Sequence, residues 1–131
     1  MRSIRTNKYK LIHNLNYFAP FPIDQDFYLS STFQDVLNRT INKLPLHWYK
    51  NLTNYYYRPE WELFDLENDK YETNNIYDKN KKKKEIFQLK KQLNYWLNLT
   101  NDPFICSPHH VLEDAGNFKT NAKCLPLANK L

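Results

Sequence analysis

The pattern of apolar and polar positions changes its period along the chain, and it begins with a strand-like alternation. After a polar Thr6-Asn7-Lys8 turn, the chain alternates between two sets of side chains, which are Tyr9, Leu11, His13 and Leu15 on one side and Lys10, Ile12 and Asn14 on the other. A period of two is typical of strands, so this pattern predicts a β-hairpin over residues 3–15. Further along the chain, the aromatic-rich stretch "HWYKNLTNYYYRPEWELFDL" is divided by Pro59. This stretch predicts two more short strands, one on each side of the proline. The antiparallel strands are therefore expected near residues 2–6, 9–15, 54–58 and 60–65.

Two other stretches follow a helical period. Residues 31–42 begin with a capping box formed by Ser31 and Gln34. Residues 83–99 predict the longest helix, which Asn101-Asp102-Pro103 ends. The apolar face of the shorter helix consists of Phe33, Val36, Leu37 and Ile41, and that of the longer helix consists of Ile86, Leu89, Leu93, Trp96 and Leu97.

These elements predict an α+β fold for a single domain over residues 1–131. A small four-stranded antiparallel sheet is expected, with the long C-terminal helix packed across it. The segment 16–29 contains prolines and the tail 103–131 lacks a regular period, so both are expected to be irregular.

Composition narrows the classes of function. Hydrophobic residues make up 41% of the chain, which is enough for a modest core. The sequence contains one glycine, which excludes the glycine-rich loops that cradle phosphate groups. A formal net charge of +5 allows an anionic partner without showing one. No stretch approaches about 18 consecutive apolar residues, so no membrane span is expected.

A run of lysines precedes the long helix, and two interpretations of it remain open. It can form a solvated first helical turn, or it can bind a polyanion such as a nucleic acid or, together with Arg2 and Arg5, a sulfated glycan. The sequence contains no motif of a nucleic-acid-binding fold, so a nucleic acid is not supported as the polyanion. The run consists of Lys81, Lys82, Lys83 and Lys84.

Cysteine and histidine residues raise the question of a catalytic or metal site. Cys106 lies close to His109 and His110, but the spacings of a zinc site are absent. His13 and His47 are isolated in apolar and aromatic surroundings, where packed histidines are expected. No catalytic residue and no metal ligand is therefore assigned.

Three sequons of the form N-x-[ST] indicate a secreted or luminal protein. They begin at Asn38, Asn51 and Asn98. Asn38 and Asn98 point away from the apolar faces of their expected helices, as a glycan requires.

Two motifs resemble the C-terminal region of the sulfatases. The stretch "RTNKYKLI" fits a hairpin of the form R-T-x-x-Y-K-x-I, and "ELFDLENDKYETNNI" fits the element E-L-Y-D-L-x-x-D-P-x-E-x-x-N-L that follows it, with Lys70 in place of the proline. The resemblance extends through "PFPIDQDFYLSSTFQDVLNRT" to the terminal "CLPLANKL", and thus over residues 1–131. It is greatest to the sulfatases that remove N-sulfate groups from heparan sulfate.

The resemblance implies a role for each cysteine. Sulfatases oxidise the cysteine of a C-x-P-S-R motif to formylglycine, but His109 and His110 follow Pro108 in this chain. The family pattern instead implies a disulfide between Cys106 and Cys124, which would close a loop of roughly 18 residues and stabilise the fold by about 3 kcal/mol. A disulfide and the family sequon at Asn38 imply an oxidising compartment, the lysosome.

The resemblance also implies what this chain lacks. Formylglycine and calcium belong to a large catalytic α/β domain, and none of its motifs occurs here. We therefore expect the chain to be the smaller, non-catalytic domain, from a truncated gene model or a partial duplicate. The partners implied are that catalytic domain, a second subunit in a homodimer, and heparan sulfate as the substrate.

Overall fold

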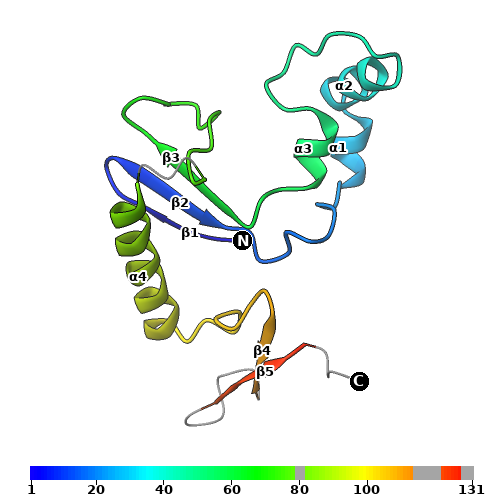
Figure 1. The fold of residues 1–131 in the computed structure, drawn as a ribbon. Coiled ribbons are helices and arrows are strands. Elements are labelled where there is room, and N and C mark those ends of the chain that lie inside the picture. Colours follow the sequence, from blue (N-terminus) through cyan, green and yellow to red (C-terminus); the bar gives the residue numbers. More distant parts are fainter. Residues whose placement is uncertain (79–81, 114–121, 128–131) are drawn as a thin grey trace. The chain divides into compact units, whose positions relative to one another are not determined.

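The computed structural model describes residues 1–78, 82–113 and 122–127, which form two compact units. The first unit combines Met1–Leu15 with Trp61–Leu131, and the second is Asn16–Glu60. The first unit contains the strands and the long helix, and the second contains short helices (Figure 1). Within the described residues, no helix is both long and apolar enough to cross a membrane.

The sheet of the first unit has three antiparallel strands, in the order β1-β2-β3. β1 (Arg2–Arg5) and β2 (Tyr9–His13) form the expected hairpin, and β3 (Trp61–Asp65) pairs with β2. At the turn, the Thr6 N–H donates to the Tyr9 carbonyl at 2.8 Å. The prediction of a four-stranded sheet is wrong in one strand, because the stretch expected as a strand at 54–58 lies in the second unit and is largely helical.

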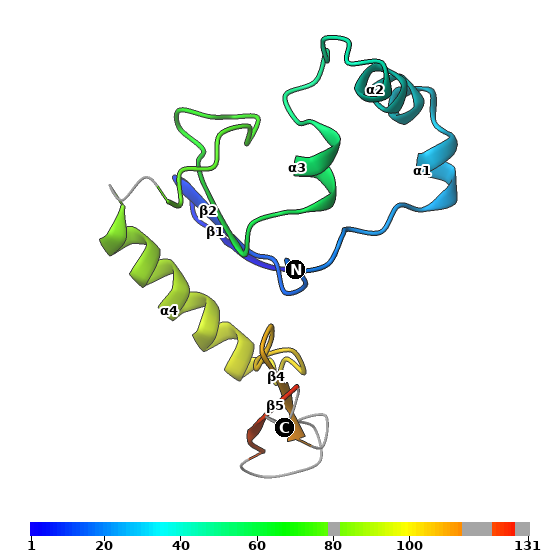
Figure 2. The same ribbon diagram turned by 45° about the vertical axis from the view of Figure 1, so that its right-hand side comes forward.

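The long helix α4 (Lys83–Leu99) has the predicted bounds and packs on the hairpin (Figures 1 and 2). Leu89 and Leu93 are its buried residues, as the apolar stripe predicts. Trp96 was expected on the same stripe, but 54% of it is exposed because it lies at the flank of the helix. The core of this unit is formed by Tyr9, Leu11, Leu63 and Leu89, with Ile4, Trp61, Ile76, Tyr77 and Ile86 packed against it.

β2 is buried on both faces, which its alternating pattern did not predict. Leu11 is fully buried on one face, and Ile12 and Asn14 are buried on the other. Lys10, also on the second face, donates to Glu72 in the loop after β3 and so ties that loop to the strand. Burial on both faces makes β2 the central element of the unit.

The tail contains regular structure where an irregular segment was expected. β4 (His110–Leu112) pairs antiparallel with β5 (Cys124–Pro126). The disulfide between Cys106 and Cys124 joins the first residue of β5 to the turn before β4. A strand pair this short is not stable by itself, so the covalent link explains why it forms. The ribbon was missed because its strands are too short for their period to be visible in the sequence.

The second unit consists of helices α1 (Gln25–Leu29), α2 (Ser31–Ile41) and α3 (Leu52–Tyr56). α2 agrees with the predicted helix, but its N-cap is Ser30 and not Ser31: the Ser30 side chain accepts a hydrogen bond from the Phe33 N–H. α1 lies in the segment 16–29 that was expected to be irregular. Phe33 and Val36 of α2 are buried, and rings from α1 and α3 lie around Phe33.

Candidate functional site

Cys106 offers no nucleophile, because its sulfur is bonded to Cys124. The two Cα atoms are 5.5 Å apart, and the Cys106 residue is buried. A disulfide sulfur cannot be converted to formylglycine, so the resemblance of this stretch to the catalytic motif is local only. The expected disulfide is present in the structure.

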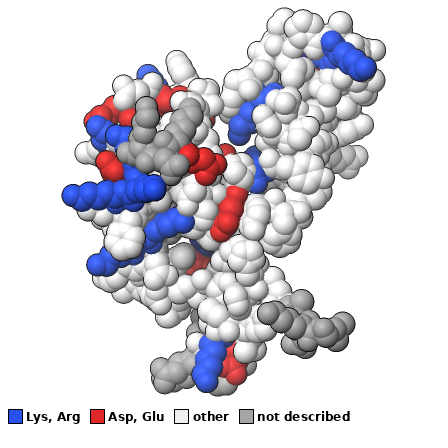
Figure 3. Space-filling model, viewed as in Figure 1, with Lys and Arg blue, Asp and Glu red and all other residues white. Residues whose placement is uncertain are grey.

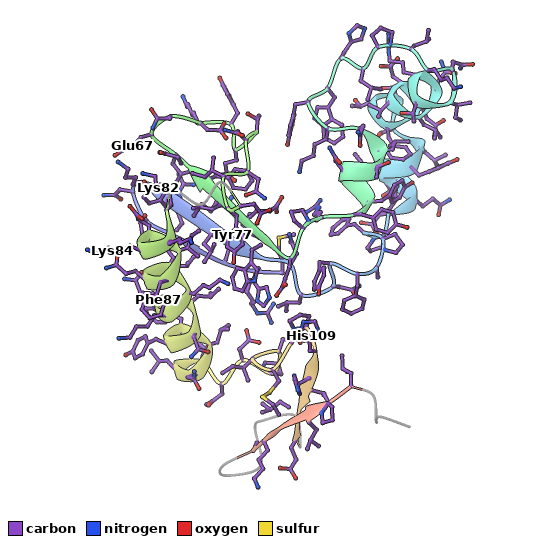
Figure 4. The ribbon with its side chains drawn as sticks, in the orientation of Figure 1. Glu67, Tyr77, Lys82, Lys84, Phe87 and His109 are labelled. Carbon is purple, nitrogen blue, oxygen red and sulfur yellow. A yellow bond between two sulfur atoms is a disulfide. The ribbon has the colours of Figure 1, made fainter. Side chains whose placement is uncertain are left out.

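The histidines do not assemble a catalytic or metal site in the described part of the chain. His109 and His110 are exposed in the tail, where Figure 4 shows His109. His13 is buried and stacks on Trp61, with ring centroids 3.9 Å apart, as a packed histidine would. His47 was also expected to be packed, but its side chain is exposed beside a cavity. No group of three or more His, Cys, Asp or Glu residues in the described ranges could hold a metal ion.

The acidic loop after β3 uses its carboxylates to hold its own backbone. Asp69 accepts hydrogen bonds from the Asn74 N–H at 2.8 Å and the Thr73 N–H at 3.1 Å, and these bonds lower the pKa of Asp69. Asp65 accepts from the Glu67 N–H in the same way. Calcium requires six or more converging oxygens. This loop does not fit the calcium ion of a sulfatase.

The lysine run is only partly available for binding. Lys81 lies outside the described residues. The ammonium of Lys82 lies 5.7 Å from the centre of the Tyr9 ring, and its interaction with the Tyr9 side chain raises the pKa of Lys82. Lys83 and Lys84 are exposed, and Lys84 projects away from the sheet (Figure 4). The run therefore offers two exposed cations among its described residues.

Arg2, which the glycan-binding interpretation also used, has a protein partner. Its guanidinium forms a bidentate ion pair with Asp102, in which Nη2 donates to Oδ1 at 3.0 Å. The guanidinium also lies 5.1 Å from the centre of the Phe104 ring. These contacts join the first strand to the segment after α4, which is a structural role.

A column of stacked side chains crosses the first unit, and no pattern in the sequence predicted it. His13 covers one face of Trp61, and the ring of Tyr77 is stacked 6.1 Å from that of Trp61. The Lys90 ammonium lies 3.8 Å from the Trp61 centroid and 5.2 Å from the Tyr77 centroid. A cation between two rings is held by both of their electron-rich faces. The column thus fixes α4 to the sheet and to the loop after β3.

The second unit contains an open cavity of about 440 Å³ with a mainly apolar lining. One acidic side chain, that of Asp35, lies at it and is paired with Arg39 one helical turn away. The lining includes a hydroxyl, a carboxylate and an imidazole, from Thr32, Asp35 and His47, but no hydrogen bond among the described residues joins these three side chains. Its lining consists of Phe27, Thr32, Phe33, Asp35, Val36, His47 and Trp48.

All three sequon asparagines are exposed. Asn38 lies on α2 and Asn98 in the last turn of α4. Asn51 is the N-cap of α3, and its side-chain oxygen accepts from the Asn54 N–H at 2.8 Å. A glycan is attached to the side-chain nitrogen, so the cap and a glycan on Asn51 are compatible.

Comparison with known proteins gives these observations their context. The chain is similar to parts of two sulfatases. It is 47% identical over all 131 residues to human N-sulphoglucosamine sulphohydrolase, of which it spans 25% of the length. It is 24% identical over 110 residues, 78% of the chain, to the ulvan-active sulfatase of Formosa agariphila, of which it spans 17%. No family model matches the chain.

Proposed function

We propose that this chain forms the smaller, C-terminal part of a lysosomal sulfatase that hydrolyses the N-sulfate groups of terminal N-sulfoglucosamine in heparan sulfate. The observation that carries the proposal is 47% identity along the entire chain to a quarter of a human protein whose name states this chemistry. The match covers all 131 residues, so the proposal extends to every element of the chain.

This part acts without catalytic groups of its own. The sulfur of Cys106 is in a disulfide, and the carboxylates of Asp65 and Asp69 accept hydrogen bonds from backbone amides. Formylglycine and calcium do not fit these residues, so we assign them to the rest of the enzyme. The contribution of this chain is then structural: it completes the enzyme beside the catalytic domain and supports a homodimer.

The same proposal places the protein in the secretory route to the lysosome. A disulfide persists in oxidising compartments, which include that route. The exposed asparagines at positions 38, 51 and 98 are the proposed sites of N-glycans. Both features are consistent with an enzyme that degrades heparan sulfate after delivery to the lysosome.

A chimeric enzyme tests the proposal. Residues 1–131 would replace the aligned quarter of human N-sulphoglucosamine sulphohydrolase, and the secreted protein would be assayed for sulfate release from an N-sulfated glucosamine substrate. We expect the chimera to turn over substrate, because nearly half of the positions are identical and the catalytic groups lie elsewhere.

The chain alone and the human protein without its aligned quarter serve as controls, and neither should release sulfate. Two results would contradict the proposal. One is turnover by the purified chain alone, and the other is a secreted, protease-resistant chimera without activity.

A further inference from the structure

A hollow of about 490 Å³ lies beside the edge strand of the first unit and has no assigned role. β1 provides Ile4 and Arg5, and the facing flank of α4 provides the remaining side chains. Its full lining is Ile4, Arg5, Lys91, Gln92, Tyr95 and Trp96. The hollow thus combines two cations, one amide and two aromatic rings in one place.

The two cations of the hollow differ from the other cations near the sheet. Neither Arg5 nor Lys91 forms an ion pair with any acidic side chain among the described residues, and both are exposed. Figure 3 shows Lys and Arg side chains gathered over α4 and the neighbouring end of the hairpin. The nearby cations that do have partners are Arg2 with Asp102, Lys8 with Glu67, Lys10 with Glu72, and Lys90 between two rings.

The aromatic rings are exposed at the same place. Tyr95 is 61% exposed and Trp96 is 54% exposed, and their ring centroids are 6.0 Å apart with the ring planes nearly perpendicular. Two exposed rings side by side form an apolar surface of the kind that binds a ligand. The C–H face of a pyranose ring packs well against an aromatic face, while its substituents remain available for polar contacts.

We propose that this hollow binds a sulfated oligosaccharide. Trp96 and Tyr95 provide faces for sugar rings, and Gln92 provides an amide for hydroxyl groups. Arg5 and Lys91 neutralise sulfate groups, and the guanidinium fork of Arg5 matches two sulfate oxygens. Two unpaired cations in one hollow favour a ligand with several anionic groups on neighbouring sugars, which sulfated glycans have.

A second copy of this chain is a poorer occupant. In a two-fold dimer the same patch would meet itself, and the cations Arg5 and Lys91 would be brought close to identical cations without an acid among the lining residues. The proposal does not depend on the proposed sulfatase role, because binding here requires no catalytic group. Failure of the chimera and failure of this site can therefore be distinguished.

The test measures binding of the 131-residue chain, with its disulfide formed, to a heparin-derived hexasaccharide by calorimetry and by tryptophan fluorescence. Arg5→Ala combined with Lys91→Ala should weaken binding about tenfold, because two charged contacts are lost. Trp96→Ala should weaken it about fivefold without any change in charge, and Trp96→Phe should restore most of the affinity.

Matched controls come from the same helix. Lys83→Ala combined with Lys84→Ala removes the same charge outside the hollow, and Phe87→Ala removes an aromatic ring that is 70% exposed there. Each control should change the affinity by less than about twofold. Circular dichroism and a disulfide assay confirm that every variant is folded, which is expected because the changed side chains are exposed.

Four results would overturn the proposal. These are no binding by the unaltered chain, an equal loss in both double variants, and an unchanged affinity in Trp96→Ala. The fourth is equally tight binding of a hyaluronan hexasaccharide, which carries carboxylates but no sulfate. Concentration-dependent dimerisation that Trp96→Ala abolishes, without sugar binding, would instead assign the hollow to a second copy of the chain.

Discussion

At the edge of the sheet, a single side chain forms hydrogen bonds that a neighbouring strand would otherwise form. The outer edge of β3 is paired by Asn75, whose Oδ1 accepts from the Leu63 N–H at 2.9 Å and whose Nδ2 donates to the Trp61 carbonyl at 3.2 Å. The Ile76 N–H also donates to the Leu63 carbonyl. These bonds satisfy backbone groups that a fourth strand would otherwise pair, which explains why the three-stranded sheet is complete at this edge.

The low glycine content has a visible consequence for the backbone. Positive φ angles occur at Lys43, Glu72 and Asn101, with values of 54°, 55° and 49°. Glycine adopts this left-handed region without cost, whereas other residues pay about 1 kcal/mol. Asn101 is the best suited of the three, because asparagine tolerates this conformation after a helix.

The first residue-scale prediction concerns the ion pair between Arg2 and Asp102. The hydrogen bonds from Arg2 lower the pKa of the Asp102 carboxyl below its ordinary value. A lowered pKa in the folded state contributes stability that is present above the unfolded pKa of about 3.9 and is lost as the pH falls through the folded pKa. Asp102→Asn should therefore reduce the free energy of unfolding at pH 7 by about 1 to 2 kcal/mol.

Urea unfolding from pH 7 down to pH 2 measures this effect. The difference between the wild type and Asp102→Asn should shrink below about pH 4, as the wild-type carboxylate is protonated. Glu67→Gln is the matched control, because Glu67 and its partner Lys8 are both about half exposed, and it should have little effect at any pH. A difference for Asp102→Asn that stays constant with pH would show that the charge is not responsible.

At the scale of elements, the sequence predicted long periodic segments well and short ones poorly. α4 was predicted with its observed bounds, because its 17 residues repeat the apolar period over several turns and Asn101-Asp102-Pro103 ends the helix. The stretch at 54–58 was assigned to a strand because tyrosines favour strands. Its conformation is instead set by a local hydrogen bond, the Asn51 cap of α3. In a helix of only five residues, a single capping hydrogen bond can outweigh the strand propensity of the tyrosines.

The second prediction tests which serine caps α2. The Ser30 Oγ accepts from the Phe33 N–H at 3.2 Å and donates to the Phe27 carbonyl at 2.7 Å, so it joins α1 to α2. Ser30→Ala should lower the free energy of unfolding by about 1 kcal/mol. Ser31→Ala, one position later, should cost less than about 0.5 kcal/mol, because Ser31 is exposed and already helical.

Thermal unfolding of the two variants in parallel gives the comparison. Equal losses would argue against the Ser30 cap, and a larger loss for Ser31→Ala would restore the capping box that the sequence predicted.

At the scale of the whole molecule, the sequence predicted the disulfide but not the exposed surface features. The disulfide was expected from the resemblance to sulfatases, and it is present. The hollow beside Trp96 was not expected, because an apolar stripe assigns Trp96 to the core and no period shows that the helix flank remains uncovered. The column of His13, Trp61, Lys90 and Tyr77 was missed for a related reason: its members come from four separate stretches, and only the fold brings them together.

The last prediction is the glycosylation of the whole chain. Passed through a secretory pathway, it should gain glycans at Asn38, Asn51 and Asn98, since all three are exposed in N-x-T sequons. Intact-mass measurement before and after removal of N-glycans counts the sites.

Each site is then removed separately, by Asn38→Gln, Thr53→Ala or Asn98→Gln. Thr53→Ala is the better change for the second sequon because it leaves the Asn51 cap of α3 in place, whereas Asn51→Gln would remove both. Each variant should lose the mass of one glycan. An unchanged mass in Asn38→Gln, with the other two sequons already removed, would contradict glycosylation at Asn38 and weaken the assignment of this protein to the lysosomal route.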